Sequence, residues 1–290
     1  MRWWCSAQTV AWDWTWRPYI GVWILLALMA ATYLWLSRAG AADLDSDAAG
    51  ADLSSDNRRG WLFWLGLFLL WVALDWPLGA LGGGYLASAH MLQFLLVGLV
   101  APLLLELGLP ASFFDRLARR PIALRVVRFL THPLMALAIF NTVLVITHHP
   151  RVVDAWMSTQ LGSFGIDALW FLAGAIFWWP VVCPVPARAR FPDLARMGYL
   201  FGNTIIAGFL ALILVFADLP VYGIYELAPP TGWLTSREDQ QIAGMLMKVG
   251  GALILWTVMS VIFFRWYRRE NPEGEVATAG PPPSHVEARS

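Results

Sequence analysis

The stretch SAHMLQFLLVGLVAPLLLE, residues 88–106, decides the class of fold. No residue between His90 and Glu106 can ionise, and only a glutamine there is strongly polar. A bilayer's hydrocarbon core is about 30 Å thick and takes roughly 20 apolar residues at helical rise. The stretch therefore predicts a helix that crosses a membrane.

The composition of the whole chain agrees with that prediction. Of its 290 residues, 58% are hydrophobic and 14% are charged, against roughly 45–50% and 25% in soluble domains. A lipid bilayer is thus the expected surrounding. The formal net charge is zero, which argues against nucleic acid as a partner.

Further windows of similar length and apolarity occur along the chain. Together with residues 88–106, they predict about seven spans, which centre on residues 19–37, 61–79, 88–106, 131–148, 165–183, 198–217 and 240–264. The expected fold is all-α, a polytopic membrane helix bundle that forms one domain over residues 1–270. The glycines of residues 82–84 predict a short turn after the second span.

Arginines predict the orientation of the bundle, because basic residues near span ends are retained in the cytoplasm. One set of alternate loops and the last span end contain Arg38, Arg58, Arg59, Arg116, Arg119, Arg120, Arg125, Arg128, Arg188, Arg190, Arg196, Arg265, Arg268 and Arg269. The other side has only Arg2, Arg17, Arg151 and Arg237. This predicts an outside N-terminus and a cytoplasmic C-terminus in a multi-pass protein of the bacterial cytoplasmic (inner) membrane. Cys5 and Cys183 would then lie on opposite sides, which predicts no disulfide between them.

Three segments are predicted to lie outside the membrane-spanning helices. Residues 38–60 are rich in Ala, Gly, Ser and Asp and predict a flexible cytoplasmic linker, and residues 271–290 predict a flexible cytoplasmic tail. Residues 113–130, FFDRLARRPIALRVVRFL, alternate arginines with apolar residues. This pattern predicts a broken amphipathic helix on anionic headgroups.

The predicted topology gathers scattered polar residues at the outer ends of the spans. These residues are Asp75, His90, His148, His149, Asp167, Asp218, Glu238 and Asp239. Ionisable groups at membrane depth usually mark a site, and imidazoles beside carboxylates or thioethers suit a metal. Met91, Met245 and Met247 lie at a comparable depth, although Met245 and Met247 are two residues apart and cannot share a helix face. One hypothesis is therefore an outer-face metal site centred on His90 and His148, where a methionine would suit a soft ion such as Cu(I).

Structural roles compete with ligation at several of these positions. Glu238 and Asp239 fall in the first turn of the last span, where the helix dipole favours acids without any ligand. Asp218 precedes a Leu-Pro pair and fits a water-exposed helix end. His149 directly precedes a proline and fits the membrane interface better than a ligand set.

Motifs of soluble catalytic sites are missing from the sequence. It contains no Gly-rich phosphate loop, no nucleophile elbow, no CxxC and no HExxH. We therefore expect a protein that is not an enzyme.

Five blocks of sequence resemble, in order, the CtaG family of caa3-type cytochrome c oxidase assembly factors. They are HMLQFLLVGLVAPLLLELGLP (90–110), THHPRVVDAW (147–156), FLAGAIFWWPVV (171–182), FADLPVYGIY (216–225) and SREDQQIAGMLMKV (236–249). The resemblance runs from the second span to the seventh, roughly two thirds of the chain. It implies a seven-span fold, a role in maturing a copper-containing respiratory oxidase, and cytochrome c oxidase subunits as partners.

The resemblance also implies particular site residues. His90 matches the first histidine of the family's HMxQH block and His148 the histidine of its WHxP block, while residues 238–241, Met247 and Asp218 match as well. Two family histidines are replaced, by Phe94 and by Asp167. A carboxylate is a harder ligand than imidazole and suits Cu(I) less.

Three functions remain open from the sequence. The leading one is a membrane-embedded assembly factor that binds or passes copper through His90 and His148, with Asp167 or Met247 as further ligands. The second is a structural accessory subunit or partner of a respiratory complex without metal, which the replaced histidines favour. The third is a haem-binding membrane redox protein with the two histidines as axial ligands.

Overall fold

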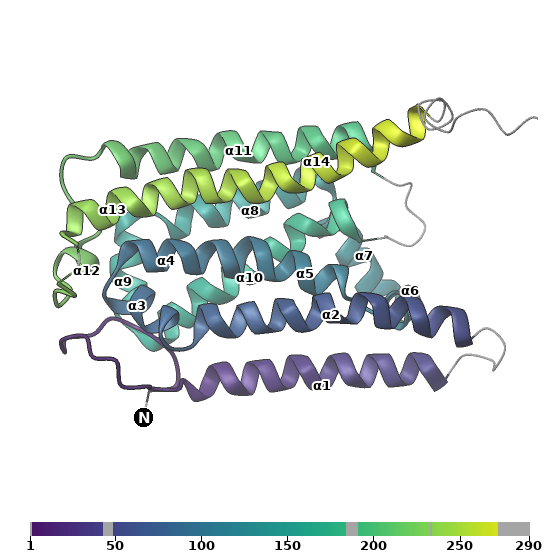
Figure 1. Ribbon diagram of the computed structural model, residues 1–290, viewed down its shortest axis with the longest axis horizontal. Coiled ribbons are helices and arrows are strands. Elements are labelled where there is room, and N and C mark those ends of the chain that lie inside the picture. Colours follow the sequence, from purple (N-terminus) through teal and green to yellow (C-terminus); the bar gives the residue numbers. More distant parts are fainter. Residues whose placement is uncertain (1, 43–48, 184–190, 233, 272–290) are drawn as a thin grey trace, which may run out of the picture.

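The computed structural model describes residues 2–42, 49–183, 191–232 and 234–271. Within these residues the chain is helical and contains no strand. The long helices lie side by side in one bundle, and Figure 1 shows them running along its longest axis. The predicted all-α membrane helix bundle is confirmed.

The helices follow one another with short connections. Their bounds are α1 Ile20–Ala42, α2 Ala49–Leu74, α3 Leu78–Gly84, α4 Ala87–Phe94, the π-helical η1 Leu95–Val100, α5 Ala101–Leu107, α6 Ala111–Ala118, α7 Pro121–Leu130, α8 Pro133–Thr147, α9 Pro150–Met157, α10 Gln160–Val182, α11 Asp193–Phe216, α12 Gly223–Glu226, α13 Ser236–Met245, the π-helical η2 Leu246–Gly250 and α14 Gly251–Glu270.

Five stretches are long and apolar enough to cross a membrane, and two bent helix pairs raise the number to seven. The bent pairs are α2 with α3, at 44°, and α7 with α8, at 68°. All seven coincide with the predicted windows. The orientation of the two termini remains a prediction.

Both bends lie at a proline. Pro77 precedes α3, and Pro133 is the first residue of α8. A proline lacks the N–H that a helix interior needs but suits a first turn, where that N–H would have no partner. Residues 82–84 were predicted to form a turn, but they complete α3 instead.

The continuous span α4–η1–α5 occupies the centre of the bundle. In it 67% of the residues are buried, against 17% in α1 at the edge. The span packs against α2, α10 and α13. Gly174 of α10 lies so close to Gly98 that an added Cβ would overlap the Gly98 carbonyl oxygen. Small residues allow such close approach between membrane helices.

The N-terminal segment, residues 2–19, crosses one end of the bundle (Figure 1). Its Trp4 and Cys5 are each 1% exposed, and the Ala7 N–H donates to the carbonyl of Met157 at 2.9 Å. The backbone at residues 5–8 runs over Gly83 and Gly84, where side chains would collide with it. Glycines at the end of α3 thus make room for a covering segment.

The structure describes part of the segments that are predicted to lie outside the spans. Helices α1 and α2 extend into the predicted linker 38–60, and residues 43–48 lie outside the described residues. The predicted tail lies outside them too, apart from residue 271. The amphipathic stretch 113–130 forms α6 and α7, which break at Arg119 and Arg120. Both cysteines are free.

Candidate functional site

His90 and His148 meet at the end of the bundle that the N-terminal segment covers. His90 lies on α4, His148 directly follows α8, and both pack on the indole of Trp170 in α10. The ring centroids are 4.8 Å apart for His90 and Trp170, and 5.8 Å for His148 and Trp170. Three spans therefore bring together the two histidines that the sequence singles out.

A backbone carbonyl fixes the tautomer of His148. Its Nδ1 lies 2.8 Å from the carbonyl oxygen of Leu144. Because a carbonyl can only accept, Nδ1 carries the hydrogen and Nε2 of the neutral ring keeps its lone pair. That Nε2 is buried and has no hydrogen-bond partner among the described residues. Metal-binding histidines commonly donate their second nitrogen in this way.

His90 is also an unusual buried group. It is 4% exposed, and neither of its ring nitrogens has a hydrogen-bond partner within the described part of the chain. A buried polar atom without a partner costs about 1–3 kcal/mol, so native proteins rarely retain one without a role. The two rings offer nitrogen lone pairs among packed aromatic side chains, which is chemistry suited to a metal such as copper. We call this cluster of His90, His148, Phe94, Trp170 and Tyr225 the histidine chamber.

Phe94 occupies the position next to His148. Its ring centroid is 4.9 Å from that of His148, with the planes at 81°, and 5.1 Å from that of Trp170. Phe94 lies one helical turn after His90 on the same face of α4. A histidine at position 94 would therefore face the pair directly.

Asp167 of α10 faces the covering segment. Its carboxylate accepts hydrogen bonds from Trp4 Nε1 at 2.8 Å and from Gln93 Nε2 at 3.1 Å. Cys5 is buried nearby; burial first, and the charge of Asp167 second, raise the pKa of its thiol well above the usual value. Asp167 thus ties the N-terminal segment to α4 and α10.

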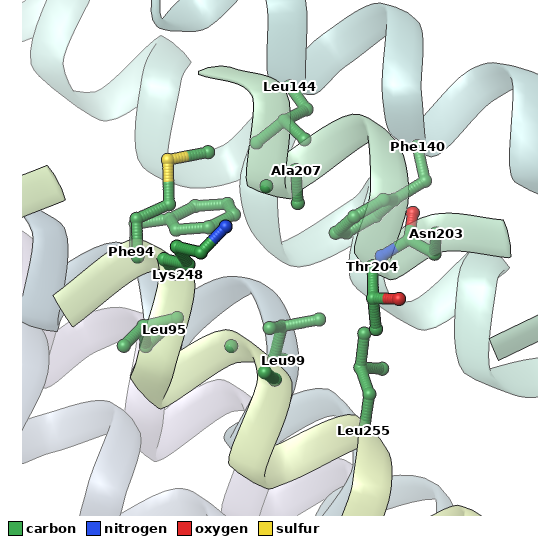
Figure 2. A pocket seen from close by; sticks show the side chains of 14 residues that line it. Phe94, Leu95, Leu99, Phe140, Leu144, Asn203, Thr204, Ala207, Lys248 and Leu255 are labelled. Atoms are coloured by element: carbon green, nitrogen blue, oxygen red, sulfur yellow. The ribbon is translucent and has the colours of Figure 1, made fainter. Parts of the chain in front are cut away.

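Met247 lies in a small cavity on the membrane side of the histidines. The cavity has a volume of about 20 Å³ and is also lined by Phe94 and Leu144, which is room for one water molecule. Figure 2 shows Lys248 and Asn203 at its border. Residues of both π-helical segments line it, and such segments occur frequently at functional sites.

Two other predicted outer residues, Asp75 and Asp239, bind the starts of helices. Asp75 is fully buried and accepts the Tyr19 N–H at 3.0 Å, at the start of α1, together with two indole N–H groups. Asp239 accepts the N–H groups of Ala87 and Ser88 at the start of α4. Each carboxylate therefore caps a helix that is distant from it in sequence.

The remaining predicted polar residues lie at the surface. Glu238 forms a capping box with Thr235 at the start of α13, which is the helix-start role that competed with ligation. Asp218 pairs with Arg237 at 3.2 Å and is 93% exposed. His149 is exposed at the N-cap of α9. None of the three contacts the histidine chamber.

Aromatic residues at the site were not identified from the sequence. Trp170 contacts both histidines, Tyr225 lies 5.7 Å from His90 between ring centroids, and Trp4 binds Asp167. Trp170 could have been found, since it follows Asp167 by one turn on the same helix face. In the described residues, no three side chains of His, Cys, Asp or Glu converge closely enough to hold a metal ion.

The sequence matches the family described as cytochrome c oxidase caa3 assembly factor (Caa3_CtaG) over residues 31–269, most of the chain. The chain belongs to the Caa3_CtaG family. This Caa3_CtaG protein is also similar to uncharacterized proteins of Mycobacterium leprae (strain TN), 23% identical over 205 residues, and of Mycobacterium bovis (strain ATCC BAA-935 / AF2122/97), 24% identical over 204 residues.

Each of these two alignments covers 65% of the Caa3_CtaG chain but only 31% of the mycobacterial protein. The relatives are thus considerably longer than the part they share with it. No solved structure matches the chain.

Proposed function

We propose that this Caa3_CtaG protein is a non-enzymatic assembly factor that associates with cytochrome c oxidase subunits and binds or passes copper through His90 and His148. The observation that carries the proposal is the pair of buried rings with unpartnered nitrogens, one of them in a fixed tautomer. The family description supports the oxidase as partner.

The chamber fits a transient copper site better than a permanent one. Imidazole nitrogen and thioether sulfur both bind copper, and Met247 is a candidate sulfur ligand because it lines the cavity beside Phe94. Fewer ligands hold an ion less tightly, which favours transfer. Asp167 is occupied by Trp4 and Gln93, so it would join only if the covering segment moved.

We further propose that the protein lies in the bacterial inner membrane with the histidines at the outer face. The seven candidate spans and the arginine distribution support this placement. An ion held there would be available to an oxidase domain that projects outward.

Copper stoichiometry tests the proposal. The full chain, purified in detergent and loaded with Cu(I) under reducing conditions, should retain about one copper per chain. His90→Ala and His148→Ala should each lose the copper, because removing one of the two imidazole ligands greatly lowers the affinity for the ion. His149→Ala is the matched control, an exposed neighbour that should change nothing.

The second candidate is a structural partner of the oxidase without metal. The replacement of two family histidines by Phe94 and Asp167 favours it. Absence of specific copper from a well-folded wild type, with oxidase subunits still co-purifying, would establish this candidate instead. A haem absorption band lost in both histidine variants would point to the third, a redox protein.

A further inference from the structure

A large pocket lies at the end of the bundle opposite the histidines. Its volume is about 1560 Å³, above the roughly 300–1,000 Å³ of ordinary small-ligand pockets. Its walls come from the ends of α5 and α10, the starts of α8 and α11, and the C-terminal half of α14. It shares no residue with the histidine chamber.

The pocket has an apolar wall and a basic rim. Leucines, valines and an isoleucine form the wall, namely Leu103, Leu107, Leu134, Leu137, Val181, Val182, Val258, Val261 and Ile262. The rim contains Arg196, Arg265, Arg268 and Arg269 and a single carboxylate, that of Asp193. The adjacent acid Glu106 is buried and faces the thiol of Cys183, with 3.7 Å between Oε2 and Sγ.

Ion pairs neutralise only part of the rim. Asp193 binds Arg196 at 3.3 Å and also binds Arg269, which ties the start of α11 to the end of α14. Arg265 and Arg268 form no ion pair with any carboxylate that the structure describes. The rim thus keeps an excess of positive charge.

Helix α7 indicates where this end lies in a membrane. Its Ile122, Val126 and Phe129 are exposed and share one face, which Arg125 borders, while Arg128 lies on another side of the helix. An exposed apolar face beside basic residues is typical of a helix at the headgroup level. His132, on the pocket's rim, follows α7 by two residues. The rim therefore lies at headgroup depth and the wall at acyl-chain depth.

We propose that this pocket binds an anionic phospholipid, with its acidic headgroup at Arg265 and Arg268 and its acyl chains along the wall of α5, α8 and α14. Basic pockets between membrane helices recognise acidic headgroups by charge, and the apolar wall suits acyl chains. This lipid would brace α14 against α8 and α11, independently of copper.

Lipid selectivity tests the proposal. The delipidated full chain would be titrated in neutral detergent with dioleoylphosphatidylglycerol and with dioleoylphosphatidylcholine, and bound lipid counted by native mass spectrometry. The wild-type protein should bind phosphatidylglycerol at least tenfold more tightly than phosphatidylcholine. The double variant Arg265→Gln, Arg268→Gln should lower the affinity for phosphatidylglycerol about 25-fold, since each basic group beside anionic lipid contributes about fivefold. Its affinity for phosphatidylcholine should be unchanged.

Matched variants separate this pocket from general surface charge. Arg119→Gln with Arg125→Gln removes the same charge from two exposed sites, the C-cap of α6 and the middle of α7, and should leave binding unchanged. Val261→Trp fills the space along the apolar wall and should lower the affinity for both lipids. Equal affinity for the two lipids, equal losses in both arginine pairs, or displacement of the lipid by millimolar inorganic phosphate would each overturn the proposal.

Discussion

At the scale of single residues, the site depends on what surrounds each imidazole. The Leu144 carbonyl orients His148 and fixes its tautomer, whereas no described residue hydrogen-bonds His90. The difference matters for binding, because a fixed ring loses little freedom when it takes an ion. His90 would gain the more from a ligand, since both of its nitrogens are buried without partners.

Phe94→His should raise copper affinity. The new imidazole would stand next to His148, where the Phe94 ring now lies 4.9 Å away, and would add a third nitrogen ligand. Competition with a Cu(I) chelator should show an affinity at least tenfold higher than wild type. Phe94→Leu removes the aromatic ring without adding a ligand, and an equal gain in that variant would contradict this geometry.

Asp239→Ala should destabilise the protein more than Glu238→Ala. Asp239 is buried and binds two N–H groups of α4 and a hydroxyl, so its loss should cost about 2–4 kcal/mol. Glu238 caps its own helix in solvent, and its loss should lower the melting temperature only slightly. Thermal unfolding in detergent measures both. Equal shifts would show that Asp239 does not hold the start of α4.

The sequence predicts that the two histidines converge, but it does not predict the hydrogen-bond partners of the buried aspartates. Convergence of His90 and His148 follows from their depth in the spans, which the positions of the apolar windows predict well. The partners of Asp75 and Asp239 could not be found in this way, because each carboxylate caps a helix far away in the chain. Local patterns reveal a capping box such as that of Glu238, but not a cap provided by another helix.

At the scale of elements, the N-terminal segment closes the end of the bundle that holds the histidines. Its Trp4 indole binds Asp167 and its Cys5 is buried. The segment thus packs over the ends of α3 and α10, beside the helices that carry the histidines. Sequence analysis predicts the spans but neither this cover nor the two π-helical segments, because none of these has a local hydrophobic period.

Trp4→Ala should expose Cys5. In a Cys183→Ser background at neutral pH, the wild-type thiol should react slowly with N-ethylmaleimide. It is buried, and its raised pKa leaves less of the reactive thiolate than an exposed cysteine has. Loss of the Trp4 anchor should speed labelling at least tenfold, and labelling should increase further as the pH rises toward the thiol's pKa.

Trp16→Ala is the matched control for this cover. Trp16 belongs to the same segment but is 57% exposed, so its removal should leave the rate of Cys5 labelling unchanged. Rapid labelling of Cys5 in the wild type would show that the segment does not cover the site.

At the scale of the whole molecule, the two ends of the bundle differ in chemistry. One end carries the histidine chamber near the N-terminal segment, and the other carries the basic rim. The amphipathic helices α6 and α7 lie at that second end (Figure 1). The seven candidate spans agree with the sequence windows because apolar length alone determines them. The direction in which the bundle is inserted rests on the arginines.

Cysteine labelling in intact cells tests that direction. In a variant without Cys5 and Cys183, Ser158→Cys should react with a membrane-impermeant maleimide from outside, and Arg125→Cys only after lysis, since both positions are exposed at opposite ends. The reverse pattern would mean that the histidines face the cytoplasm.

X-ray absorption at the copper edge of the Cu(I)-loaded full chain tests whether His90 and His148 hold the ion. We predict imidazole scattering from His90 and His148, a sulfur contribution that disappears in Met247→Leu, and no histidine-bound copper in the double alanine variant. A spectrum without imidazole ligands, or one that is unchanged in the double variant, would contradict the claim that these two histidines hold the ion.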